Sequence, residues 1–224
     1  VSYVFFEDDT LTVVKKRLTR LCERIKKEKL NLDFGCFSRV DVFDEKTAKL
    51  LNESGFRMVI FGIESGVPEI LKKIGKSANI EQARRAIELC AKYKIKSYAS
   101  FVVGFPFESK RDIEQTIAFG KSLNASVLTF NPLVPFPGTP LFIEEKHRPG
   151  DTAGWSRFLT MGKPPFDMTP GVSADQLKAM VDRAHLLYYL NPKRLLRMIA
   201  GIRSFSELLS YFRAFTGMVR RSFN

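Results

Sequence analysis

The chain has 224 residues, 45% of them hydrophobic, and a formal net charge of +12. This length and composition fit one sizeable α/β domain with a helical appendage and exclude a wholly disordered chain. No run approaches the roughly 18 consecutive apolar residues of a membrane span. Three cysteines leave an odd thiol under any pairing, so we expect a reducing compartment, the cytoplasm, rather than a disulfide scaffold.

Strand-like and helix-like segments alternate through the first 130 residues. Residues 1–6 have strand composition, and apolar residues from Leu11 to Ile25 then recur at helical spacing behind a cap at Asp9 or Thr10. An extended run at 32–38 precedes a helix at 44–54, which Gly55 ends. The later elements expected in this region are a strand at 58–61, a helix from Asn79 with a capping box to Gln82, a strand at 97–103, a helix at 109–123 and a strand at 126–130.

The pattern changes after Phe130. Residues 132–172 hold most of the prolines and the single tryptophan, Trp155, and indicate an irregular segment. Ser173 and Gln176 form a second capping box ahead of an amphipathic helix that Pro192 interrupts. One or two basic helices are expected in 193–203 and 204–220. From residue 183 to the end, eight basic residues face one acidic residue, which suits an anionic partner and equally a solvated helical face.

Strand–helix alternation with short loops predicts parallel strands joined by right-handed crossovers. Five such units are too few to close an eight-stranded barrel, so we expect an open or incomplete sheet. Two domains are expected, at 1–142 and 143–224.

The chemically informative residues lie where the predicted strands end. Since the carboxyl ends of parallel strands form the ligand-binding face of α/β folds, these residues predict a binding or catalytic face. They are Asp8, Asp9, Ser38, Arg39, Gly62, Glu64, Gly104 and Phe105.

Two of these features leave alternatives open. Asp8 or Asp9 could hold a cation or an ammonium group, or the acids could serve as a helix cap with solvated neighbours. Arg39 suits a carboxylate or phosphate, and it also suits an ion pair with Asp41 or Asp33.

The cysteines and histidines give no metal-ligand spacing. Cys22 and Cys90 lie on helix faces and are interpreted as small core residues, whereas Cys36 at a strand end is kept as a site candidate. His147 and His185 are expected to be surface or packing residues. We assign no catalytic residue and no metal ligand within this chain.

Five motifs occur together in a recognisable order. They are Phe5-Phe6-Glu7-Asp8-Asp9-Thr10, Cys36-Phe37-Ser38-Arg39-Val40-Asp41, Phe61-Gly62-Ile63-Glu64-Ser65-Gly66, Val103-Gly104-Phe105-Pro106-Phe107-Glu108-Ser109 and Pro135-Phe136-Pro137-Gly138-Thr139-Pro140. In this order and spacing the chain resembles the radical S-adenosylmethionine superfamily. The resemblance is closest to the branch with an N-terminal cobalamin-binding domain, of the Fe–S oxidoreductase type, and it covers about residues 1–142.

The resemblance implies a partial (β/α)6 barrel of the TIM type with a C-terminal helical extension. It further implies that S-adenosylmethionine binds at the strand ends. Asp8 and Asp9 would receive the methionine ammonium, and Arg39 and Ser38 would hold the carboxylate or ribose. The stretch from Gly62 to Glu64 would border the ribose, and Val103, Gly104 and Phe105 would border the adenine.

The chain departs from the family at its cluster loop. Members carry a Cys-x3-Cys-x2-Cys loop that holds a [4Fe–4S] cluster, and the three cysteines here lack that spacing. The sequence also starts at Val1 within an apolar run, so we interpret it as truncated after the loop and inactive alone. The cluster, and cobalamin if it is used, would then belong to the full-length protein.

Two functions follow. The first is the radical domain of an Fe–S oxidoreductase or cobalamin-dependent methyltransferase, acting on a small or lipid-like molecule with flavodoxin or ferredoxin as electron donor. For it we expect peripheral contact with the inner face of the membrane through the basic C-terminal helices, and no nucleic acid. The alternative is a catalytically dead module that binds RNA or an acidic partner through that tail. We make no prediction of the specific substrate, the reaction type or the oligomeric state.

Overall fold

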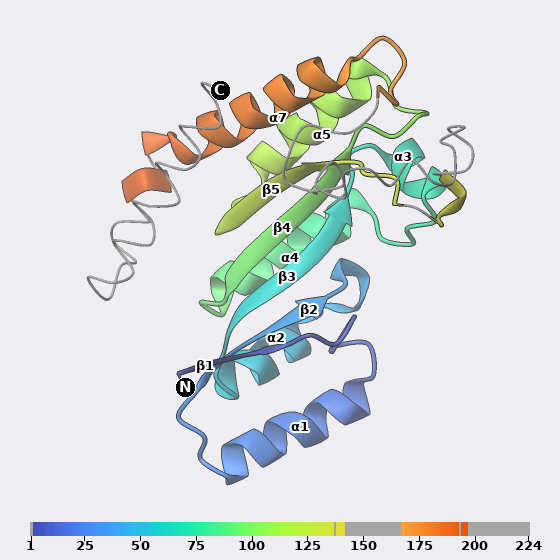
Figure 1. Ribbon diagram of the computed structural model, residues 1–224. Coiled ribbons are helices and arrows are strands. Elements are labelled where there is room, and N and C mark those ends of the chain that lie inside the picture. The colour runs from blue at the N-terminus through green and yellow to red at the C-terminus, as the bar shows by residue number, and fades with distance from the viewer. Residues whose placement is uncertain (1, 137, 142–166, 193, 197–224) are drawn as a thin grey trace. The chain divides into compact units, whose positions relative to one another are not determined.

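The computed structural model in Figure 1 describes residues 2–136, 138–141, 167–192 and 194–196. These residues divide into two compact units. The first comprises the described part of 1–102 together with 114–129, and the second the described part of 103–113 and 130–224. The expected boundary at residue 142 differs from this division and stays a prediction.

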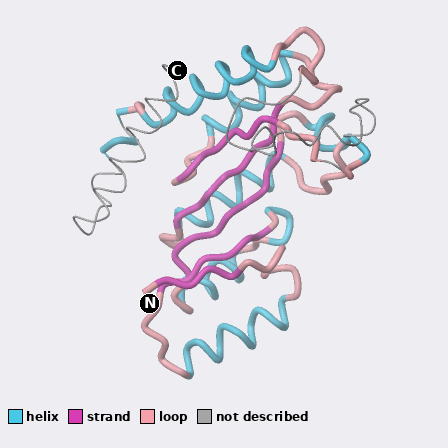
Figure 2. The backbone as a smooth tube through the Cα atoms, viewed as in Figure 1, coloured by secondary structure: helices cyan, strands magenta, loops and turns pink. Residues whose placement is uncertain are grey.

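Five parallel strands form one sheet, as the alternation predicted. The strands are β1 (Tyr3–Phe6), β2 (Asp33–Ser38), β3 (Phe56–Glu64), β4 (Lys96–Val103) and β5 (Val127–Pro132), and they lie in the order β1-β2-β3-β4-β5. The tube drawing shows them as neighbouring magenta segments (Figure 2). Because the spatial order equals the chain order, right-handed crossovers place the connecting helices on one face of the sheet.

Helices connect the strands, and a further helix follows β5. They are α1 (Lys15–Lys27), the 3-10 helix η1 (Val40–Val42), α2 (Glu45–Glu53), α3 (Pro68–Lys73), α4 (Ile80–Lys92), α5 (Lys110–Ser122) and, in the second unit, α7 (Ala174–Tyr189). Within the first unit α1 packs beside α2, and α2 beside α4 (Figure 1). The capping boxes at Asn79 and at Ser173 are both formed, which confirms the predicted starts of α4 and α7.

Phenylalanine rings build much of the core of the first unit. Phe34 and Phe56 have ring centroids 5.4 Å apart, and Phe43 and Phe61 meet edge to face at 5.0 Å. Phe56 and Phe61 are completely buried. Burying each such ring contributes roughly 1.5–3 kcal/mol, and aromatic pairing adds about 0.5–1.5 kcal/mol.

The helices differ from the predictions in two details. Helix α1 begins at Lys15 with Val14 as an N-cap that makes no side-chain bond, instead of starting behind Asp9 or Thr10. In the segment before it Leu11 and Thr12 are buried, and the Thr12 hydroxyl lies 2.6 Å from that of Ser38 at the end of β2, so these residues form turns instead of the first helical turn. Helix α3 was not expected; Pro68 at its first turn starts it, and Ile70 and Leu71 bury its inner face.

Several predictions lie outside the described residues. They concern His147, Trp155, most of the segment 132–172, and the helices expected in 193–203 and 204–220 with their basic tail. Among the described residues, no helix has the length and hydropathy that crossing a membrane requires.

Candidate functional site

The end of β1 presents two carboxylates of different character. Asp8 Oδ2 accepts a hydrogen bond from Arg17 Nη2 on α1 at 2.8 Å, so its charge is already balanced. Asp9 is exposed, and its side chain makes no ion pair or hydrogen bond with a described residue. Of the two acids, Asp9 is therefore the one that can accept an incoming ammonium group without displacing a partner.

Ser38 at the end of β2 faces the protein interior. Its hydroxyl lies 2.6 Å from the hydroxyl of Thr12, and both side chains are buried. This pair fastens the segment after β1 to the end of β2. Ser38 thus positions the two strand ends relative to each other, and its predicted contact with a ligand stays a prediction.

Arg39 is engaged by Asp41. Arg39 Nε and Nη2 donate to the two carboxylate oxygens of Asp41 at 3.0 and 2.6 Å, a bidentate pair, and this contact lowers the pKa of the Asp41 carboxyl. Asp33 is instead close to Arg57, at 3.4 Å. Of the alternatives that the sequence left open, the ion pair with Asp41 is formed. A ligand carboxylate would have to share or replace Asp41.

The end of β3 holds Glu64 in an unusual backbone conformation. Its φ is +71°, and the N–H of Ser65 donates to the carbonyl of Ile63 at 3.0 Å, which together define a γ-turn. A non-glycine residue at positive φ costs roughly 1–2 kcal/mol and is typically found where function or tight packing requires it.

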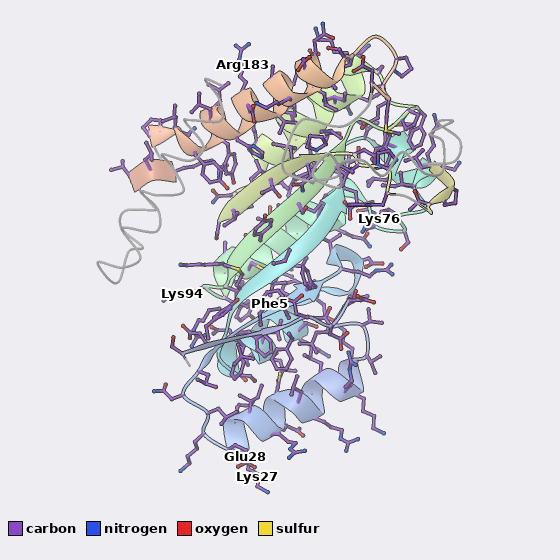
Figure 3. The ribbon with its side chains drawn as sticks, viewed as in Figure 1. Phe5, Lys27, Glu28, Lys76, Lys94 and Arg183 are labelled. Carbon is purple, nitrogen blue, oxygen red and sulfur yellow. The ribbon has the colours of Figure 1, made fainter. Side chains whose placement is uncertain are left out.

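Because Gly62 has no side chain, it leaves space for the carboxylate of Glu64. A Cβ at position 62 would lie 2.5 Å from Glu64 Oε1, so any larger residue would push the carboxylate aside. Lys76 Nζ binds that same oxygen at 3.0 Å, beside the C-terminal end of β3 in Figure 3. The Glu64 carboxylate is therefore fixed in direction from both sides.

A loop that the sequence did not single out joins these strand ends. Between α3 and α4, Lys76 binds Glu64, and the adjacent Ser77 accepts a hydrogen bond from Arg39 at 2.6 Å. The Ser77 hydroxyl also donates to Asp41 at 3.2 Å. No local pattern could have revealed Lys76 and Ser77, because their partners lie 12 to 38 residues away in the chain.

Behind Glu64 the chain is held by a buried hydroxyl pair. Ser65 Oγ lies 3.0 Å from Thr116 Oγ1, which also accepts the N–H of Gly66 at 3.1 Å. Ser65 and Thr116 are fully buried. This contact anchors the γ-turn to α5.

In the second unit, Gly104 and Phe105 follow β4 around a buried carboxylate. Glu108 Oε2 accepts the N–H groups of Gly104 and Phe105 at 2.6 and 2.9 Å, and Gly104 has a φ of +98°. Glu108 is 2% exposed, and its other oxygen has no hydrogen-bond partner among the described residues. Burial raises the pKa of this carboxyl against the opposing effect of the two N–H groups. Glu108 shapes the turn that carries Gly104 and Phe105.

A hollow of about 650 Å³ opens in the first unit between η1 and the N-termini of α2 and α4. Asp41 lies on its wall, whereas Asp8, Asp9, Gly62 and Glu64 do not. The predicted strand-end residues therefore do not form this hollow.

The cysteines do not fit a [4Fe–4S] cluster. Cys22, Cys36 and Cys90 are all buried and unpaired with one another, and no three His, Cys, Asp or Glu residues within the described ranges converge as metal ligands do. Burial raises the pKa of Cys36 to about 12 and also raises that of Cys90, so neither is a thiolate at neutral pH. Cys36 is a core residue inside β2, and its interpretation as a site candidate was wrong.

The sequence matches the Radical SAM superfamily over residues 5–120, which is more than half of the chain. The chain therefore belongs to the radical SAM superfamily of enzymes, whose members use S-adenosylmethionine and a [4Fe–4S] cluster. The predicted family and the partial α/β barrel are both confirmed.

Two proteins have sequences similar to that of this chain. The chain is 34% identical over 200 residues to an uncharacterised methyltransferase of Pyrococcus horikoshii, covering 89% of this chain and 43% of that protein. It is 30% identical over 146 residues to the anaerobic magnesium-protoporphyrin IX monomethyl ester cyclase of Rubrivivax gelatinosus, covering 64% of this chain and 26% of the cyclase. The chain thus spans less than half the length of either relative.

A solved structure shares the fold. The radical S-adenosylmethionine methyltransferase TsrM from Kitasatospora setae, determined with cobalamin and a [4Fe–4S] cluster bound, superposes with a TM-score of 0.57 at 24% identity. The match covers 63% of this chain and 28% of TsrM.

Proposed function

We propose that this chain is the S-adenosylmethionine-binding part of a larger radical enzyme of the methyltransferase type. The single observation that carries the proposal is the arrangement at the ends of β1, β2 and β3. An unpartnered carboxylate at Asp9, a guanidinium at Arg39 and an oriented carboxylate at Glu64 follow three neighbouring strands of the family's domain.

The chemistry of this donor set matches the polar groups of S-adenosylmethionine. Asp9, with Asp8 beside it, would bind the methionine ammonium, and Arg39 would bind the methionine carboxylate. Glu64, held by Lys76, would accept hydrogen bonds from the ribose hydroxyls. When bound, S-adenosylmethionine supplies the adenosyl group from which this superfamily derives its radical. The assignment of Val103, Gly104 and Phe105 to adenine remains a prediction for the second unit.

The cluster must be held by residues outside this chain, since the buried thiols described above cannot ligate it. Cobalamin enters the proposal through TsrM, and methyl transfer through the Pyrococcus relative and TsrM. We propose an apolar small molecule as the substrate, a small redox protein as the electron donor, and a cytoplasmic location with peripheral membrane contact.

The test is calorimetric titration of the chain with S-adenosylhomocysteine, which keeps the adenosine, ammonium and carboxylate groups. We expect binding, and a roughly 10- to 100-fold weaker affinity for Asp9→Asn and for Glu64→Gln, because each variant removes a charged hydrogen-bond partner. Glu53→Gln on the far end of α2 is the matched control and should bind as the native chain does. A native chain without measurable binding, or Asp9 and Glu64 variants indistinguishable from the control, would refute the proposal.

A second measurement concerns the native polypeptide isolated without oxygen from its source. A protein well above 25.5 kDa with about four irons per cluster agrees with the proposal. A native polypeptide of this size without iron contradicts it.

A further inference from the structure

The outward face of α1 carries a row of cations. Lys16, Arg20, Arg24 and Lys27 are all exposed and follow one another at spacings of four, four and three residues. At about 100° per residue the four side chains fall within an arc of roughly 80°, and at 1.5 Å per residue the row is about 16 Å long. Figure 3 shows Lys27 at the end of this helix. We call these four residues the α1 row.

The opposite face of α1 is buried. Leu18, Cys22 and Ile25 pack into the core of the first unit, and they lie about 170° around the helix from the α1 row. The helix is therefore fixed to the unit by its apolar stripe, which leaves the α1 row facing solvent.

The α1 row differs from the other cations of the helix. Lys15, Arg17 and Lys26 form ion pairs with Asp44, Asp8 and Glu53. No residue of the α1 row makes an ion pair with any described residue of the chain, although Glu23 borders the same face. Four positive charges are thus kept close together with one neighbouring acid, Glu23, to offset them, and the remaining excess of positive charge favours an anionic partner.

The sequence alone leads us to expect no nucleic acid; from the structure we propose instead that the α1 row binds the phosphate backbone of a nucleic acid. This goes beyond the proposed S-adenosylmethionine site and does not depend on it. A DNA duplex carries one negative charge per about 1.7 Å of its axis, both strands counted, so a row of cations about 16 Å long meets a dense array of phosphates. A basic helix on a chain with a pI near 9.7 is the electrostatic pattern of nucleic-acid-binding proteins.

The composition of the face favours a polyphosphate over a membrane or a protein. A membrane-surface helix inserts an apolar face into the lipid, and here that face is buried in the core. A protein interface usually centres on an aromatic or aliphatic anchor, and the α1 row has none. Val13 and Val14 are exposed, but they precede the helix and lie outside the row. Because the row offers only cations, we expect binding without base specificity.

The test is fluorescence anisotropy with a labelled DNA duplex of about 20 base pairs, titrated with the whole chain between about 50 and about 200 mM salt. We expect the triple variant Lys16→Gln, Arg20→Gln, Arg24→Gln to bind at least tenfold more weakly. Its plot of log affinity against log salt should be shallower by about 2.7, since each lost phosphate contact removes about 0.9. All three positions are exposed, so circular dichroism should show an unchanged fold.

The matched control removes the same charge elsewhere. Lys46, Lys72 and Lys94 are exposed, belong to other parts of the first unit and make no ion pair with described residues. The triple variant Lys46→Gln, Lys72→Gln, Lys94→Gln should retain most of the affinity. Equal losses in both variants would show that net charge alone attracts the duplex, and would overturn the assignment to α1.

Two other results also overturn the inference. One is a native chain that does not bind the duplex at the lowest salt concentration. The other is stripping of the chain from the duplex by vesicles of phosphatidylserine and phosphatidylcholine, with vesicle binding lost in the α1 variant, which would make the row a lipid-headgroup contact. Since S-adenosylhomocysteine binding is measured separately, failure here leaves the proposed function standing.

Discussion

Gly66 lies where the chain leaves β3 and meets α5. A Cβ at this position would be 2.6 Å from Phe119 Cβ and 3.0 Å from Thr116 Cα, so a backbone and a side chain would both have to move. We expect Gly66→Ala to lower the free energy of unfolding by about 1–3 kcal/mol, the usual cost of overpacking. Urea unfolding measures it.

Gly75 provides the comparison for this substitution. It has a φ of +71° and no atom within 4 Å of its Cβ position, so Gly75→Ala should cost only the backbone strain, about 1 kcal/mol. If Gly66→Ala is no more destabilising than Gly75→Ala, the close approach of α5 to Gly66 is absent in solution.

Glu108 supports a second prediction at the scale of single residues. Glu108→Ala should destabilise the chain by about 2 kcal/mol or more, because it leaves the buried N–H of Gly104 and the N–H of Phe105 without an acceptor. Glu108→Gln keeps an acceptor oxygen and should cost less than about 1 kcal/mol near neutral pH. Chemical denaturation of the two variants distinguishes these costs.

The pH dependence of Glu108 has a defined sign. Its pKa is raised in the folded state, so the unfolded carboxyl releases its proton first as the pH rises above 4.5. The stability of the native chain relative to Glu108→Gln should therefore fall as the pH rises from about 4.5 through the folded pKa. A constant difference across that range would mean that the carboxyl is hydrated.

For single residues, the sequence predicted which side chains lie at the strand ends but not what they contact. It identified Asp9, Arg39 and Glu64 because polar residues directly after apolar strands are visible in one dimension. It could not resolve whether Arg39 binds Asp41 or a ligand, since the same guanidinium can form an ion pair with either. It missed Arg17, Lys76 and Ser77 because their contacts depend on how helices and loops return to the sheet.

At the scale of elements, α7 and β5 are joined by a histidine in the second unit. The backbone N–H of Phe130 donates to His185 Nε2 at 2.9 Å, which requires a neutral imidazole, and burial lowers the pKa of His185 below 6.5. The unfolded state therefore takes up a proton first as the pH falls. Stability should decline from about pH 6.5 downward through the folded pKa, although nearby Asp182 opposes the shift.

Urea midpoints at about pH 7.5 and about pH 5.5 test the role of His185. The native chain should lose stability between these values, and His185→Gln should lose clearly less because the titrating group is gone. Equal losses in the two proteins would assign the pH dependence to other groups. The interpretation of His185 as a packing residue is confirmed by its contact with Phe130.

Element boundaries were predictable where a cap or a glycine marks them. Asn79 and Ser173 start their helices as capping boxes, and Gly55 with a φ of +87° follows the end of α2. The start of α1 was not predictable, because Leu11 fits the helical pattern but is buried before the helix begins, next to Thr12, whose hydroxyl meets Ser38. Tertiary burial outweighed local periodicity there.

For the whole molecule, the three thiols give a chemical prediction. Iodoacetamide at about pH 8 should leave Cys22, Cys36 and Cys90 largely unmodified in the native chain, because all three are buried and their pKa values are raised. In denaturant all three should react, as intact mass will show. Rapid native alkylation of Cys36 would reopen its candidacy as a site residue.

The order of the strands has a consequence for how the protein folds while it is being synthesised. Each strand from β2 to β5 lies next to the strand synthesised just before it, so none has to wait for a later segment to find its neighbour. A ribosome releases the chain N-terminal end first, and a single crossover separates each strand from the neighbour made before it. The sheet can thus be assembled in the order of translation, one strand and helix at a time.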